Sequence, residues 1–118
     1  MDTYQPNPNA NAVGTSLRAE TPRITYARLV KVFGKPHYDA HALAPDQRGD
    51  GKISTEWDFT GPDGSVFTLY DYEETSLYSR GLPSVAKFRA DRHGYNWHVG
   101  GHGDATQFLA WLMRKVRS

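Results

Sequence analysis

The chain has 118 residues, a formal net charge of +1 from 14 basic and 13 acidic side chains, and no cysteine. The balanced charge excludes strong non-specific binding to nucleic acid, and the lack of cysteine excludes disulfides, thiolate nucleophiles and cysteine-based zinc sites. No apolar run approaches the roughly 20 residues of a membrane-spanning helix, and the N-terminus lacks the pattern of a signal peptide. We therefore expect a cytoplasmic protein without membrane contact.

The first twenty residues differ in composition from the rest of the chain. Residues 1–20 are rich in Pro and Asn and hold few large apolar side chains. Such a segment buries too little surface to offset its ordering entropy, so we predict a disordered N-terminal tail. Residues 21–118 are predicted to form one α+β domain, whose small core would gain from contacts in an oligomer.

The first predicted helix covers residues 26–33. Apolar side chains recur there at helical spacing, and Thr25 is in position to cap the first turn. Gly34 ends the helix, and Pro36 prevents it from resuming.

A β-hairpin is predicted next. Residues 53–60, ISTEWDFT, alternate apolar and polar side chains, which indicates a half-buried strand. The turn Gly61-Pro62-Asp63-Gly64 suits a type I turn with a bulge, which places Phe59 opposite Phe67. A register shifted by one residue would turn Phe67 to solvent, so the bulged register is preferred.

A long loop over residues 73–94 precedes the last two elements, a strand at 95–99 and a C-terminal helix. Asp104 is the expected N-cap of that helix, and Gln107 completes a capping-box pattern. The element order is α-β-β-β-α. It predicts a small antiparallel sheet of about three strands, with the N- and C-terminal helices packed on one face.

The stretch WHVGGHGD, residues 97–104, resembles a ligand-binding loop at first sight. It lacks the spacing of known phosphate-binding glycine loops, and the carboxylate of Asp104 opposes an anion at the helix start. We interpret the glycines as a tight connection between strand and helix. Only His98 and His102 are candidate contacts, and no set of residues has the spacing of a metal site.

The predicted register turns several polar side chains away from the core: Glu56, Asp58, Tyr70, Tyr72 and His98. Glu56 and Asp58 are expected to point into solvent with unshifted pKa values, so we predict no acid–base catalysis and no catalytic residue. The aromatic members are candidates for a ligand or protomer interface, because Tyr is enriched at interfaces. The alternative is an ordinary solvated sheet face.

The loop 73–94 is the second candidate region. Arg80, Arg89 and Arg92 accompany aromatic side chains there. An aromatic ring can cover a base while a guanidinium holds phosphate, so these residues suit nucleotide recognition. A solvated, variable loop is the alternative.

The segments ITYARLVKVFGKP, STEWDFTGPDGSVFTLYDYE and YNWHVGGHGDATQFLAWL share an order of motifs: a Phe-Gly-x-Pro helix end, a Trp hairpin ending in Tyr-Asp-Tyr, and Trp-His-Val-Gly-Gly before the last helix. In these motifs the chain resembles small accessory proteins of tailed bacteriophages, over roughly residues 24–112. The loop 73–94 and the N-terminal tail depart from the shorter family pattern. The resemblance implies a viral protein that counters defences in the host cytoplasm.

Together these features favour a non-enzymatic, homo-oligomeric binding protein that sequesters a nucleotide-derived immune signal. Its predicted ligand contacts are Tyr70, Tyr72, His98, Arg80, Arg89, Arg92 and His102, with no cofactor and no metal. An inhibitor of a host defence protein, similar in kind to anti-CRISPR proteins, is the first alternative. A small hydrolase is the second.

Overall fold

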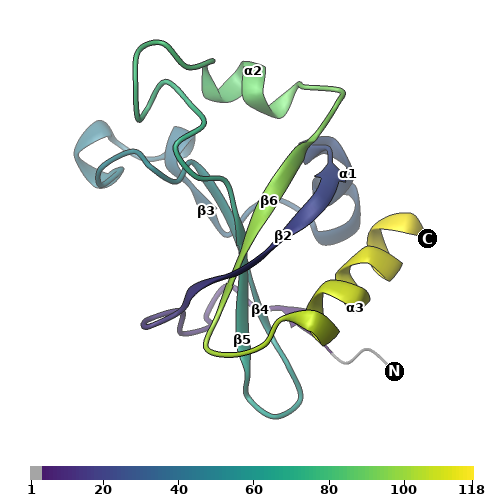
Figure 1. Ribbon diagram of the computed structural model, residues 1–118. Helices are drawn as coiled ribbons and strands as arrows, with labels where there is room; N and C mark the ends of the chain where they lie inside the picture. Colours follow the sequence, from purple (N-terminus) through teal and green to yellow (C-terminus); the bar gives the residue numbers. More distant parts are fainter. Residues whose placement is uncertain (1–3) are drawn as a thin grey trace.

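The computed structural model of the chain describes residues 4–118, within which six strands form one antiparallel sheet (Figure 1). The strands are β1 Gln5–Pro6, β2 Ser16–Ile24, β3 Tyr38–Asp39, β4 Thr55–Thr60, β5 Val66–Tyr70 and β6 Tyr95–Gly101. Their order is β1-β4-β5-β6-β2. Strands β1 and β3 pair with opposite ends of β4, at Phe59 and Thr60 and at Thr55 and Glu56.

Three α-helices accompany the sheet in the described part of the chain: α1 Tyr26–Phe33, α2 Val85–Arg89 and α3 Thr106–Arg117. Helices α1 and α3 lie together on one face, whereas α2 lies at one end of the sheet (Figure 1). Two short 3-10 helices, η1 Ala40–Ala42 and η2 Pro45–Gln47, interrupt the loop between β3 and β4. No helix within residues 4–118 is long and apolar enough to cross a membrane.

The α+β class is confirmed, but the predicted three-stranded α-β-β-β-α arrangement is wrong. Strand β2 was not predicted from the sequence. Its pairing with β6 is irregular between Leu17 and Ala19 and again between Glu20 and Arg23. These shifts break the alternation of apolar and polar side chains that marks a strand. Strands β1 and β3 have two residues each, so only their tertiary partners define them.

The segment 1–20, expected to be a disordered tail, holds β1 and the first half of β2. Tyr4 is only 7% exposed, and its ring contacts Phe67, Phe108 and Trp111 in the core. One buried aromatic ring and backbone pairing therefore attach residues 4–6 and 16–20 to the domain, although the average composition there is polar. Residues 1–3 of the predicted tail lie outside the described residues.

The predictions for α1 and for the hairpin are confirmed. Helix α1 spans Tyr26–Phe33, the Thr25 side chain accepts a hydrogen bond from the Arg28 backbone N–H, and Gly34 has a positive φ of 83°. In the hairpin, Phe59 pairs with Phe67 and Trp57 with Leu69. Local signals sufficed here because capping, turn chemistry and side-chain alternation all favour the same register.

The start of α3 differs from the prediction. The helix begins at Thr106 with Ala105 at the N-cap, and the capping pair of Asp104 and Gln107 is not formed. The Asp104 carboxylate instead accepts hydrogen bonds from the backbone N–H and the hydroxyl of Thr106. Asp104 therefore stabilises the turn that precedes the helix, one residue before the N-cap.

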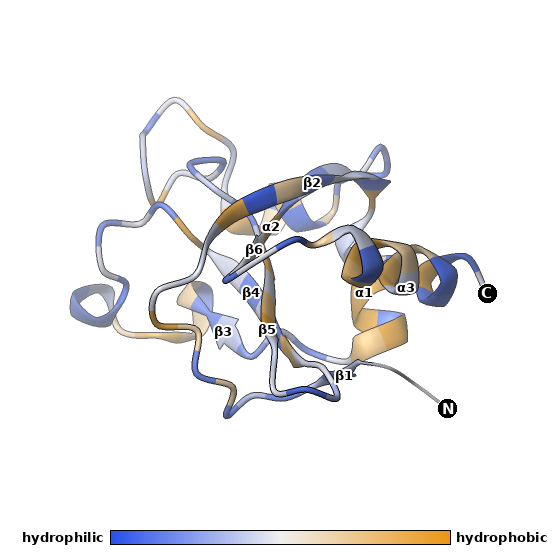
Figure 2. Ribbon diagram, turned by 60° about the horizontal axis from the view of Figure 1, so that its bottom comes forward, coloured by the Kyte–Doolittle hydropathy of each residue, from blue (hydrophilic) through white to orange (hydrophobic). Residues whose placement is uncertain are grey.

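The core lies between the sheet and helices α1 and α3. Phe59 contacts Phe33 and Phe108, and Phe67 stacks on Phe108 with ring centroids 4.8 Å apart. Figure 2 shows the hydrophobic segments of α1 and α3 on this side of the sheet and largely hydrophilic loops around the other side. The aromatic core thus occupies one face and leaves the other face for polar residues.

Candidate functional site

The sheet face opposite α1 and α3 is polar, and loops surround it. Residues 7–15 connect β1 at one edge to β2 at the other edge, and both views place this segment on the polar side (Figures 1 and 2). The backbone N–H of Asn7 donates to the carbonyl oxygen of Asp58 at 2.8 Å. The loops 40–53 and 73–84 lie on the same side (Figure 1). Loops therefore border the polar face on several sides.

The loop 40–53 and the strands enclose a groove of about 620 Å³ on this face. Its lining combines two tyrosines, two basic residues and three carboxyl groups: Tyr38, Tyr72, Arg48, Lys52, Asp50, Glu56 and Asp58. The Lys52 ammonium lies 3.8 Å from Asp50 Oδ2. A groove of this size, in the range of roughly 300–1,000 Å³ typical of ligand pockets, can hold a nucleotide-sized molecule.

The loop 40–53 is held in place at Gly51. A β-carbon at this position would lie 2.1 Å from the Leu77 carbonyl oxygen, and Gly51 has a φ of +76°. Only glycine fits this close approach of two backbones. The contact joins the loop 40–53 to the loop 73–84 and so fixes one wall of the groove.

Glu56 is the most perturbed group in the groove. Burial, followed by the hydrogen bond and the negative charge of Asp58, raises the pKa of Glu56 to about 9. Glu56 is therefore protonated at neutral pH. The expectation that Glu56 points into solvent with an ordinary pKa is wrong. Strand β3 pairs Tyr38 with Glu56 at the sheet edge and removes the carboxyl group from water.

Asp58 contributes a buried carboxylate beside Glu56. Its Oδ1 atom is buried, and apart from the protonated Glu56, which hydrogen-bonds to the Asp58 carboxylate, no side chain within residues 4–118 is placed to donate to it. The backbone N–H of Asp58 donates to Nδ1 of His37 at 2.9 Å, which leaves the imidazole proton on Nε2. Burial lowers the pKa of His37, against the opposing effect of the Asp58 charge.

Three of the residues predicted as ligand contacts come together beside the groove. The Tyr70 ring stacks on His98 with centroids 5.5 Å apart, and the Tyr72 ring lies 5.8 Å from His98. The Tyr95 hydroxyl is 3.1 Å from Nδ1 of His98 and holds the imidazole in place. Tyr72 is 37% exposed, with the Lys52 ammonium 5.9 Å from its ring centroid, so part of this ring is open to a ligand.

Arg89 was also predicted as a ligand contact, but its guanidinium donates its hydrogen bonds to other residues of the protein. Its guanidinium donates to Asp39 Oδ1 at 2.8 Å and to Thr55 Oγ1 at 2.9 Å, and it lies 4.7 Å from the Tyr26 ring centroid. Burial raises the pKa of Asp39, but the hydrogen bonds and charge of Arg89 outweigh it and hold that pKa below the ordinary value. Arg89 therefore joins α2 to the sheet.

The structure places the other predicted contacts outside the groove. Arg80 is exposed in the loop before α2, and Arg92 is exposed in the turn after α2. His102 lines a separate hollow with Tyr4 and Gln107, near the turn of the hairpin.

The basic residues that do line the groove, Arg48 and Lys52, were missed by sequence analysis. They flank two glycines just before β4, in a loop that resembles any polar turn.

No group of three or more metal-ligating side chains is present in the described part of the chain. No protein-family model matches the chain, and a comparison with curated proteins also finds no match. The functional argument therefore depends on the geometry of the polar face.

Proposed function

We propose that this protein binds a small nucleotide-like ligand in the groove on the polar face and holds it without chemical conversion. One observation carries the proposal: a groove of about 620 Å³ joins the partly exposed ring of Tyr72, the basic side chains Arg48 and Lys52, and a protonated Glu56 beside Asp58. Aromatic, cationic and neutral hydrogen-bonding groups in one cleft match the three parts of a nucleotide.

Each part of the groove has a distinct role in this proposal. The Tyr72 ring stacks with the base, since every base has a face that an aromatic ring can cover. Arg48 and Lys52 hold phosphate oxygens by charge-assisted hydrogen bonds. The protonated Glu56 adds no negative charge to the groove at neutral pH, which lessens repulsion of an anionic ligand.

The biological setting of the proposal comes from the resemblance to phage accessory proteins. We propose that the ligand is a nucleotide-derived immune signal, and that the protein removes it from the host cytoplasm as a homo-oligomer. Light scattering coupled to size-exclusion chromatography tests the oligomer directly. A monomer at micromolar concentration would contradict that part of the proposal.

A hydrolase is the second candidate, because the structure adds one observation in its favour. A protonated Glu56 beside Asp58 is the type of carboxyl pair that general acid–base catalysis uses. Such a pair would transfer a proton to a leaving group and activate water. The sequestering and hydrolytic functions predict different fates for the same ligand.

The experiment incubates purified protein with cyclic di- and trinucleotides and ADP-ribose derivatives, and follows thermal shift. Ligand recovered intact after denaturation supports sequestration, whereas altered ligand supports the hydrolase. Tyr72→Ala and Arg48→Ala are expected to weaken binding about tenfold each, from lost stacking and lost charge. Arg92→Ala, an exposed arginine outside the groove, is the matched control. No shift with any compound, together with capture of a host defence protein, would favour the inhibitor instead.

A further inference from the structure

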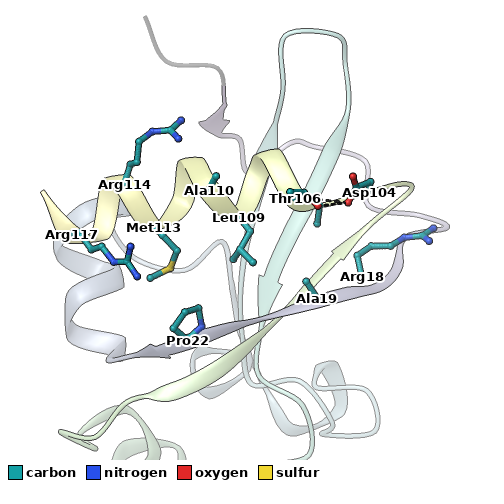
Figure 3. A pocket seen from close by; sticks show the side chains of 11 residues that line it. Arg18, Ala19, Pro22, Asp104, Thr106, Leu109, Ala110, Met113, Arg114 and Arg117 are labelled. Carbon is teal, nitrogen blue, oxygen red and sulfur yellow. Dashed lines mark hydrogen bonds between the residues drawn. The ribbon is translucent and has the colours of Figure 1, made fainter.

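A second groove lies between the outermost strand β2 and helix α3 (Figure 3). Its volume is about 540 Å³, and its floor is apolar: Ala19, Pro22, Leu109, Ala110 and Met113. Leu109 and Met113 point from α3 toward β2 in Figure 3. A neighbouring hollow of about 400 Å³ shares Pro22, Met113 and Arg117 with it, so the two form one continuous depression along the helix.

Arginines surround this apolar floor. Arg18 lies at one end, Arg117 at the other, and Arg114 extends from the outer side of α3 (Figure 3). The Arg18 Nε donates to the Gly101 carbonyl oxygen at 3.0 Å, which orients the guanidinium without neutralising its charge. Among the described residues, Asp104 is the single acidic one that lines the groove, and its carboxylate is bonded to Thr106.

We propose that the β2–α3 groove docks an acidic, amphipathic helix of a partner protein. The arginines complement acidic side chains, and the floor receives apolar side chains at the i, i+3, i+4 spacing of one helix face. No aromatic residue of the described chain lines the groove, so it lacks the stacking surface on which proteins hold single-stranded nucleic acid.

The shape of β2 favours a docked helix over an added strand. Its pairing with β6 shifts register between Leu17 and Ala19 and between Glu20 and Arg23. Such bulges twist an edge strand and interrupt the regular row of backbone groups that strand addition requires. Pro22 also removes one backbone donor from this edge. The groove and the polar-face site lie on opposite sides of the sheet, so each can be tested without the other.

The test selects a displayed library of random peptides, each about four helical turns long, against the full-length protein. Recovered peptides are expected to be acidic, with apolar residues at helical spacing, and synthetic copies should bind more weakly as salt rises. Ala110→Glu and Arg117→Glu, both at exposed positions, are expected to weaken binding at least about tenfold through repulsion. Lys31→Glu, exposed on α1 and equal in charge change to Arg117→Glu, should leave the affinity unchanged.

Three results would overturn the proposal. The library could yield no binding peptide, or peptides that bind the two groove variants as tightly as the unmodified protein. A 12-nucleotide single-stranded DNA, or vesicles containing phosphatidylglycerol, could instead bind in a way that the Arg117→Glu change abolishes. This third result would assign the groove to nucleic acid or to a membrane surface, according to which of the two binds.

Discussion

Replacement of Glu56 by Gln is expected to make the protein more stable at alkaline pH. The native carboxyl group holds its proton up to a pKa of about 9, whereas the unfolded chain releases it near the ordinary value of 4.5. Between these values the native state binds more protons than the unfolded state, so the free energy of unfolding falls as pH rises. The stabilising contribution is complete below about pH 4.5 and is lost toward pH 9.

The size of the effect follows from that window. Each pH unit corresponds to about 1.4 kcal/mol, so between pH 5 and pH 8 an isolated group would lose about 4 kcal/mol. The groove is open to solvent, which screens the charge of Glu56, so we expect about half of this, or about 2 kcal/mol. A glutamine side chain at this position cannot ionise and keeps its hydrogen-bonding capacity, so the Glu56→Gln variant should gain about 2 kcal/mol relative to the unmodified protein over this range.

Urea unfolding at pH 5, 6, 7 and 8 measures this difference. Glu20→Gln, at an exposed position of β2, is the control for the loss of one ionisable glutamate. Its unfolding free energy should follow that of the unmodified protein at every pH. Parallel curves for Glu56→Gln and the unmodified protein, or a Glu56→Gln variant that loses stability at pH 8, would refute the assignment of a protonated Glu56.

Further predictions concern the wall of the groove, the arginine beside it and the ligand. Gly51→Ala is expected to cost at least about 2 kcal/mol in urea unfolding, whereas Gly49→Ala, which also has a positive φ but no described neighbour within 4 Å, should cost about 1 kcal/mol; equal costs would contradict the close contact with Leu77. Arg89→Met should lower stability by about 2–3 kcal/mol in the same assay and leave nucleotide affinity unchanged; the reverse pattern would make Arg89 a ligand contact. Nucleotide affinity, measured by calorimetry, should fall as pH passes about 9 and Glu56 ionises, and Glu56→Gln should remove that fall.

Local chemistry allowed part of the fold to be predicted. Helix α1 was predicted correctly because Thr25, Gly34 and the apolar stripe act within a few residues of one another. The hairpin register followed from turn chemistry and side-chain alternation in the same way. The additional strands could not be found like this, since β2 is bulged and β1 and β3 are ordered by partners distant in sequence.

Part of the candidate site could also be predicted from local sequence patterns. Side-chain alternation placed Glu56, Tyr70 and His98 on one face, and the structure brings them together there. The shifted pKa of Glu56 could not be predicted, because it depends on β3 and on a loop that composition describes only as polar. The role of Arg89 was missed because its partner Asp39 lies 50 residues earlier in the chain.

The most direct test of the proposed site is nuclear magnetic resonance. The ¹⁵N-labelled protein is titrated with a nucleotide that raised its melting temperature in the thermal-shift assay. We predict saturable amide shifts at the residues that line the groove on the polar face, with α3 unaffected: Tyr38, Arg48, Lys52, Glu56, Asp58 and Tyr72. Shifts confined to α3 and β2, or no shifts with a nucleotide that raises the melting temperature, would contradict the assignment of the polar face as the ligand-binding site.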